Sequence, residues 1–296
     1  MSFTIEAKMS ATQLDTLATC RLKWWFAHAK GYKPIARNVA FDLGTGLHLA
    51  LAGFYKSRKD PVAVFEKWID KEIRAVYALM ETGDDLIAQA MENDVESLQD
   101  NLVMGRYMLE QYLIRYQHER LEILQVEKEV FKSIPGTDWD FHAVIDMLVR
   151  DGHRRNKVYV MDHKSFTRFY LAYLEKDHQF TSYAWAAADL IDEPVAGVLY
   201  NGLRKQNPGS TSKLDLFERH TLDINGHQVK LFLKRLRDVH RLLTQGKFCV
   251  YPEPSPISCG YCQFRDPCTL YMKGEDYGFL LDNLYTKKSE REYDEG

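Results

Sequence analysis

Two carboxylates and a lysine stand at spacings that suit the cleavage of a phosphodiester bond. Asp162-His163-Lys164 ends an apolar segment with the pattern of a strand, and side chains two residues apart on a strand point to the same face. Asp146 lies in the preceding strand pattern. Paired carboxylates suit a hard divalent cation, and a lysine beside them could orient or deprotonate the attacking water. Alone, however, a D-x-K tripeptide is common by chance and usually means solvated charges.

Three further polar residues strengthen this interpretation. His48 closes the segment Gly44-Thr-Gly-Leu-His in a helical region before the strands, although a lone histidine is more often a satisfied core or surface residue. Gln179 and Tyr183 are four residues apart on the helix expected after the D-x-K strand. They therefore share one face of that helix and could reach a phosphate or the lysine.

Four of the five cysteines form a second, independent signal. Cys259, Cys262 and Cys268 have the spacing C-x2-C-x5-C, and Cys20 lies far upstream on the first expected helix. Thiolates two residues apart in a turn can share one metal centre, and a remote fourth thiolate would complete a tetrahedral set for zinc or a cubane cluster. Cys249 does not fit the pattern and is expected to be a buried structural cysteine.

The order of these motifs along the chain resembles the RecB-like branch of the PD-(D/E)XK nuclease superfamily. It is most similar to the iron–sulfur members, which include CRISPR-associated adaptation exonucleases, the AddB subunit and phage-encoded exonucleases. The resemblance spans about Ser10 to Cys268. It implies an α/β fold with a restriction-endonuclease-like core, a mixed central sheet flanked by helices. It also implies a helical N-terminal part and an iron–sulfur staple that joins the two ends of the chain.

The resemblance also implies roles for the individual residues. It favours a 4Fe-4S cluster over zinc for the four cysteines and implies Mg2+ or Mn2+ as the catalytic metal. One departure, Ser165 in place of the threonine of many relatives, puts little in doubt. Glu127 and Glu129 are weaker candidates for outer carboxylates. The implied metal ligands are His48, Asp146, Asp162 and the backbone carbonyl of His163, the implied catalytic lysine is Lys164, and the implied supporting pair is Gln179 and Tyr183.

Charge is unevenly distributed in a chain with a net charge of -3. Residues 201–250 hold ten Lys or Arg against four Asp or Glu, whereas residues 81–100 hold seven acidic residues and no Lys or Arg. This composition excludes a polycationic coat for nucleic acid but allows a local basic groove. The candidates for DNA contact lie beside the expected catalytic hairpin and beyond it: Arg150, Arg154, Arg155, Lys157, Arg168, Arg204 and Lys205.

The hydrophobic pattern changes from helical to strand spacing near residue 120. We expect a mainly helical part over 1–120, the nuclease core over 121–248, the cysteine segment over 249–285 and a disordered tail over 286–296. Within the core, residues 123–164 read as an antiparallel meander of three strands. The 296 residues, 45% of them hydrophobic, are enough for a sizeable core. We expect no membrane span and a cytoplasmic location.

The sequence therefore predicts a metal-dependent DNA nuclease, with an exonuclease acting on single strands or DNA ends favoured by the resemblance alone. It could serve a recombination, phage or CRISPR adaptation complex. One alternative is a DNA-binding or assembly scaffold that keeps the nuclease fold. Another is a DNA endonuclease or binding module stapled by zinc.

Overall fold

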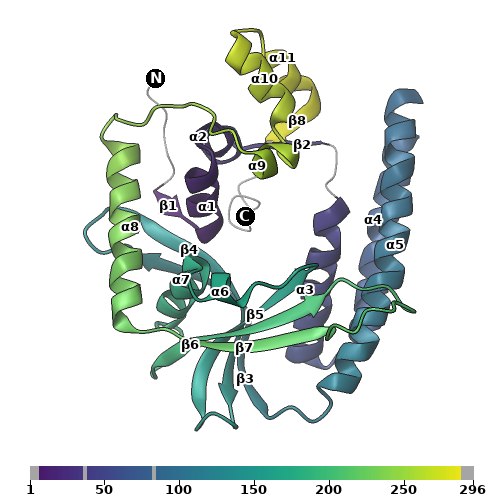
Figure 1. Ribbon diagram of the computed structural model, residues 1–296, viewed down its shortest axis with the longest axis vertical. Helices are drawn as coiled ribbons and strands as arrows, with labels where there is room; N and C mark the ends of the chain where they lie inside the picture. Colours follow the sequence, from purple (N-terminus) through teal and green to yellow (C-terminus); the bar gives the residue numbers. More distant parts are fainter. Residues whose placement is uncertain (1–6, 36–38, 82–84, 288–296) are drawn as a thin grey trace. The chain divides into compact units, whose positions relative to one another are not determined.

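The chain divides into two compact units, shown together in Figure 1. The computed structural model describes residues 7–35, 39–81 and 85–287. Unit 1 is built from Met1–Arg37, Glu129–Val144 and Gly226–Gly296, and unit 2 from Asn38–Lys128 and Ile145–Asn225. The four segments expected from the sequence follow the order of the chain, whereas these units combine remote segments. Those segment boundaries stay a prediction.

Three long helices and most of the sheet make up unit 2. The helices are α3 (Val39–Ser57), α4 (Pro61–Met80) and α5 (Asp85–Arg115), which pack side by side (Figure 1). Asp60 begins α4, because its carboxylate accepts a hydrogen bond of 3.0 Å from the backbone N–H of Val62 and proline follows at the first helical position. Buried side chains of all three helices, among them Leu47, Phe65 and Leu109, join the core of the sheet.

The sheet mixes parallel and antiparallel strands, as expected. The strands are β3 (Leu121–Ser133), β4 (Asp140–Asp151), β5 (Lys157–Phe166), β6 (Val195–Arg204) and β7 (Phe217–Asp223). β3 pairs with β4, β4 is antiparallel to β5, β5 is parallel to β6, and β6 is antiparallel to β7. The crossover from β5 to β6 holds α6 (Leu171–Leu174) and α7 (His178–Ala187). α3 packs on β5, and α7 packs on β5 and β6, so helices flank the sheet.

Unit 1 joins the N-terminal segment to the C-terminal one. Its helices are α1 (Ala11–Thr19), α2 (Arg21–Trp24), the π-helical turn η1 (Trp25–Ala29), α8 (Gly226–Thr244), α9 (Pro256–Gly260), α10 (Arg265–Lys273) and α11 (Gly278–Leu284). Its short strands are β1 (Lys8–Met9), β2 (Tyr32–Pro34) and β8 (Tyr285–Lys287). β1 is parallel to β4, and β2 is antiparallel to β8.

Two expectations for unit 1 are corrected by this arrangement. Thr286 and Lys287 were assigned to a disordered tail over 286–296, but both belong to β8 and pair with β2; residues 288–296 lie outside the described residues. Cys20 was placed within one continuous helix, but its backbone is extended, with φ -164°, and separates α1 from α2. In that position it ends one helix and caps the next.

None of the helices in the described ranges combines the length and apolar character that crossing a bilayer requires.

A buried polar network ties the strands of unit 2 to its helices. The side chain of Arg219 on β7 donates to Asn201 Oδ1 on β6 at 2.9 Å, to Tyr112 Oη on α5 at 3.1 Å and to Glu119 at 2.9 Å. Tyr112 in turn lies 2.7 Å from the hydroxyl of Tyr55 on α3. Because the guanidinium offers several donors in fixed directions, one side chain satisfies three acceptors on different elements.

We predict that Arg219→Met lowers the free energy of unfolding by about 3 kcal/mol, because Glu119 and Asn201 lose their charged partner in a poorly solvated place. The measurement is urea denaturation followed by circular dichroism. The matched control is Arg106→Met, which removes an arginine paired with two carboxylates at the surface and is expected to change stability by less than about 0.5 kcal/mol. Equal effects of the two substitutions would contradict a structural role of the network.

Candidate active site

Asp162 and Lys164 lie on the same face of β5, as the strand spacing predicts. Lys164 Nζ donates to Asp162 Oδ1 at 2.9 Å. The Asp162 side chain is almost wholly buried, and its second oxygen, Oδ2, has no hydrogen-bond partner among the described residues. Burial raises the pKa of Asp162, and the nearby Asp146 charge adds to the rise, while Lys164 opposes it. A buried carboxylate oxygen without a hydrogen-bond partner lowers the stability of the fold, and a bound ligand would relieve this penalty.

Asp146 on β4 joins this pair through a histidine and a backbone amide. Its Oδ2 lies 3.2 Å from His48 Nδ1 and accepts the backbone N–H of His163 at 2.8 Å. Burial raises the pKa of Asp146, but the charge and hydrogen bond of His48 outweigh it, so the pKa is well below its ordinary value. The same pairing raises the pKa of His48 against the opposing effect of burial.

The glycine before His48 explains how α3 reaches β5. A Cβ atom on Gly44 would stand 3.3 Å from the Ser165 hydroxyl, closer than most side chains tolerate. Glycine therefore lets the helix backbone lie against the end of β5. His48 follows one helical turn later and meets Asp146, so the G-x-x-x-H spacing has a structural cause.

The imidazole of His163 points to the opposite face from Lys164 and is fixed in one tautomer. Arg219 can only donate, so it sets the Asn201 amide with its oxygen toward the guanidinium and its nitrogen toward His163 Nδ1, at 2.7 Å. His163 Nδ1 therefore accepts, and Nε2 carries the proton toward Met147 Sδ at 3.2 Å. Burial lowers the pKa of His163 to about 3, which keeps the ring neutral.

Gln179 and Tyr183 lie where the helical spacing predicts, on one face of α7. Asp177 caps the helix by accepting the backbone N–H of Gln179 at 2.9 Å, and Gln179 Nε2 donates to Tyr183 Oη at 2.9 Å. Tyr183 is within electrostatic range of Lys164 and Asp162. Burial lowers the pKa of Lys164, but Asp162, Tyr183 and Asp146 together outweigh it and raise the pKa, so the lysine stays charged.

Glu127 on β3, a weaker candidate from the sequence, lies within electrostatic range of Asp146 and His48. Burial raises its pKa to about 7, with further effects from Asp146 and His48, which places it within range of both. Its φ of +48° is unusual for a residue other than glycine. Glu129, the other weak candidate, pairs instead with His142 at 3.0 Å.

No sequence pattern pointed to the residues behind His163. Asn201, Arg219, Tyr112 and Tyr55 come from four elements, and their contacts join residues up to 107 positions apart. No spacing rule connects such residues, and Arg219 lies among other polar residues of β7, so the strand pattern does not single it out.

The case for a metal ion at these residues depends on the types of donor present, because their spacing does not form a complete binding site. Over residues 7–35, 39–81 and 85–287, no three His, Cys, Asp or Glu side chains are close enough together to hold a metal ion. The donor types nonetheless suit a divalent cation. His48 and Asp146 are 3.2 Å apart, both lie within electrostatic range of Asp162, and Asp162 Oδ2 is buried without a hydrogen-bond partner among the described residues. His48, Asp146 and Asp162 are the residues that would hold it.

The four cysteines of the predicted cluster gather in unit 1. The thiols of Cys20, Cys259 and Cys262 all lie within electrostatic range of Cys268. Cys20 Sγ accepts backbone N–H groups of Lys23 and Glu253 at 3.5 Å each, and Cys259 Sγ accepts that of Ser255 at 3.4 Å. Amide donors aimed at sulfur stabilise thiolate ligands, so the donor types suit a metal centre. As placed in the described residues, no three of these thiols lie close enough together to hold one. Cys249 is exposed, and the expectation that it is buried is wrong.

Protein contacts alone already join the two ends of the chain around these cysteines. The backbone N–H of Leu22 donates to the Tyr251 carbonyl at 3.0 Å, and that of Arg21 to the Glu253 carboxylate at 2.5 Å. The Phe26 ring packs on that of Phe264, with centroids 5.4 Å apart. Trp24, Trp25 and Phe26 are buried, in agreement with a core role.

The arginines and lysines expected to contact DNA are largely engaged with the protein. Arg150 forms ion pairs with Glu122 and Glu193, at 2.8 and 2.6 Å, and Lys157 lies 3.5 Å from Asp223. Arg204 is buried and donates to the carbonyls of Asp215 and Thr167. The others differ in exposure: Arg154, Arg155 and Arg168 are exposed, with Arg154 3.8 Å from Asp151, and Lys205 is half-buried.

Comparisons with known proteins bear on the family of the chain. The family model of the PD-(D/E)XK nuclease superfamily matches residues 8–269. No curated protein sequence matches the chain. Two solved structures are similar to it. The crystal structure of SSO0001 shares 14% identity, with 89% of this chain and 86% of that chain covered and a TM-score of 0.34. A "Putative exonuclease" from Eubacterium rectale shares 12% identity, with 98% and 96% covered and a TM-score of 0.48.

Structural similarity at this level bears on neither substrate nor activity. The family match is different in kind, because it covers most of the chain and spans both the cysteines and the carboxylates. By this match the chain belongs to the PD-(D/E)XK nuclease superfamily.

Proposed function

We propose that the protein is a metal-dependent deoxyribonuclease that degrades single-stranded DNA or DNA ends, and that its four cysteines hold a 4Fe-4S cluster. The observation that carries the nuclease activity is the unpartnered Oδ2 of buried Asp162, beside Lys164 and within range of Asp146. A buried carboxylate oxygen without a hydrogen bond lowers the stability of the fold, and such groups are typical of sites that bind a ligand.

The residues of the site divide the work of hydrolysis between them. A divalent metal held by His48, Asp146 and Asp162 would supply a Lewis acid and a more acidic water. Lys164, held charged by Asp162, would orient the attacking water and offset the negative charge that develops on the phosphate. Tyr183, oriented by Gln179, would contact the DNA backbone or the lysine. Glu127, within electrostatic range of Asp146, would accept a proton.

The cluster would act as a staple for unit 1. The cysteines join α2 to α9 and α10, where backbone contacts already hold the ends together. A set of one remote ligand and three local ones suits either zinc or iron–sulfur chemistry, and we favour iron–sulfur because the sequence resembles the iron–sulfur nucleases.

A scaffold that binds DNA without cutting it is the alternative from another class. The retained pair of carboxylates beside a charged lysine argues against it, because a scaffold has no use for a buried, unpartnered carboxylate oxygen. An endonuclease would have the same chemistry at the same residues, so only the substrate distinguishes it from an exonuclease.

We predict that end-labelled linear single-stranded DNA is degraded with Mg2+ or Mn2+, whereas circular single-stranded DNA survives. An exonuclease needs an end, and a chelator should abolish the reaction. The assay follows nucleotide release from protein purified without oxygen. Cleavage of the circle would replace the exonuclease by an endonuclease, and survival of both substrates with metal present would favour the scaffold.

We predict that Lys164→Ala reduces the rate of cleavage by at least about a hundredfold while DNA affinity and the visible colour stay unchanged, because the lysine acts on the reacting phosphate and water. Rates and binding are measured in parallel. Lys176→Ala, which removes an exposed lysine just before α7, is the control and should cut normally. A Lys164→Ala protein that still cuts would refute the assignment of the site.

We predict that Cys262→Ser loses absorbance near 400 nm together with its iron, and that its thermal unfolding midpoint falls, because a ligand of the staple is gone. Cys249→Ser removes the exposed cysteine outside the set and should keep both. Iron analysis and absorption spectra check this outcome. Wild-type protein that is colourless and contains zinc would replace the cluster by a zinc staple.

A further inference from the structure

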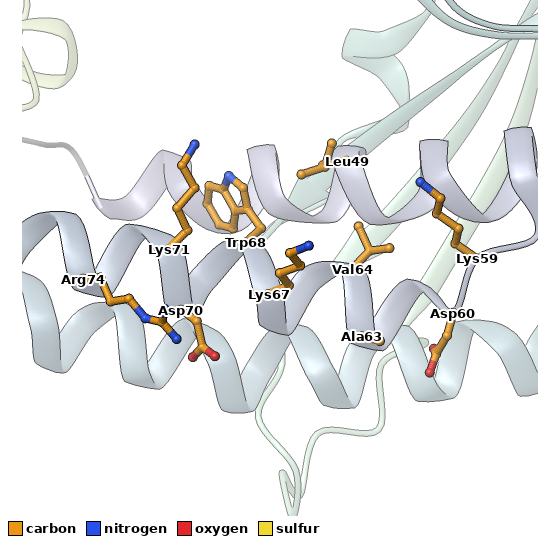
Figure 2. A pocket seen from close by; sticks show the side chains of 10 residues that line it. All are labelled: Leu49, Lys59, Asp60, Ala63, Val64, Lys67, Trp68, Asp70, Lys71 and Arg74. Carbon is orange, nitrogen blue, oxygen red and sulfur yellow. The ribbon is translucent and has the colours of Figure 1, made fainter.

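A groove of about 960 Å3 opens along α3 and α4 in unit 2 (Figure 2), and none of the residues predicted to bind DNA lines it. One of its side chains, Leu49, follows directly after His48 on α3. The groove thus lies within about one helix diameter, roughly 10 Å, of a residue of the candidate active site. Its lining consists of Leu49, Lys59, Asp60, Ala63, Val64, Lys67, Trp68, Asp70, Lys71 and Arg74.

Four cations line this groove without a carboxylate partner. Lys59, Lys67, Lys71 and Arg74 are exposed, and none of them forms an ion pair anywhere in the described part of the chain. The last three are spaced by four and three residues and so share one face of α4. Figure 2 shows Arg74 at one end of the row and Lys59 at the other. Four cations against the two acids Asp60 and Asp70 leave the groove positive in a chain with a net charge of -3.

The floor of the groove is apolar and held in place. A Cβ atom on Gly46 would stand 2.6 Å from the Trp68 ring, so the indole lies directly on the backbone of α3. Its neighbour Phe65 is fully buried, with ring centroids 6.2 Å apart. Leu49 is 47% exposed beside it. Cations above an aromatic and aliphatic floor are the combination that binds a phosphate backbone with unpaired bases.

Three of the cations near β5 differ from those of the groove, although Arg154, Arg155 and Arg168 are exposed as well. Arg150 and Lys157 are already neutralised by carboxylates, and Arg204 is buried, so each would have to exchange a protein partner for a phosphate. Among the residues that the structure describes, Lys67, Lys71 and Arg74 have no such partner to lose. Phosphate binding gains most from cations that are exposed and unpaired, because only counterions are displaced.

We propose that this groove binds single-stranded DNA, with the phosphates on Lys59, Lys67, Lys71 and Arg74 and unpaired bases against Leu49 and Trp68. The assignment rests on the proposed nuclease function and names the surface that holds the substrate next to the helix of His48. Duplex DNA would leave the apolar floor uncovered, because its bases are stacked inside.

The test compares two pairs of lysines, each four residues apart on an exposed helix face. Lys67→Ala with Lys71→Ala alters the groove, and Lys230→Ala with Lys234→Ala alters α8 by the same charge. Binding to a labelled oligothymidine is followed by fluorescence anisotropy at several KCl concentrations without divalent metal. The groove variant should bind about tenfold more weakly at 0.1 M KCl, and its log–log salt slope should fall by about 1.4, for two lost phosphate contacts. The α8 variant should match the wild type.

Other outcomes would overturn the proposal. These are an unchanged affinity in the groove variant, an equal loss in the α8 variant, or an equal loss for a blunt duplex. A Lys67→Arg, Lys71→Arg variant must restore binding. Hydrolysis of bis-(p-nitrophenyl) phosphate, which is too small to reach the groove, should be unchanged in the groove variant. A wild type that cleaves neither this ester nor DNA refutes the nuclease activity, while the binding comparison still decides the groove.

Discussion

Two carboxylates on neighbouring strands, the half-buried Asp146 and the buried Asp162, are the constraint on which the rest of unit 2 depends. Asp146 and Asp162 would repel each other in a place poor in water, and either alone would be costly to bury. Lys164 and His48 offset that cost, one from the same strand and one from α3. The close approach of α3 to β5 at Gly44, and the strand order that sets β4 beside β5, both follow from the need to bring these four groups together.

The backbone of β5 between Asp162 and Lys164 has a support of its own. His163 gives its N–H to Asp146 on one side, while its ring is fixed by Asn201, and Asn201 by Arg219. A neutral imidazole, a carboxamide and a guanidinium therefore hold the D-x-K segment from behind. Because Arg219 also contacts Tyr112 and Glu119, the long helix α5 takes part in placing residues that it does not touch.

The sequence predicted those features that depend on residues close together in the chain. Strand alternation predicted that Asp162 and Lys164 meet, and helical spacing predicted the pair Gln179 and Tyr183. The helix carrying Cys20 was predicted as continuous because its apolar spacing is unbroken, but the extended backbone at Cys20 is set by contacts with the remote segment near Glu253. The network around Arg219 left no trace in sequence spacing. Likewise, ion pairing decides which cations are available to DNA, and composition does not report it.

The central claim is that Asp146 and Asp162 form a metal site that Lys164 completes. Its most direct test is anomalous diffraction at the manganese edge from crystals soaked in the Mn2+ concentration that supports cleavage. The account predicts a peak bound by Asp146 and by the unpartnered Oδ2 of Asp162, and no peak in crystals of Asp162→Asn. A wild-type protein that cuts DNA while its manganese peak lies elsewhere, or while no peak appears at these carboxylates, would contradict the claim.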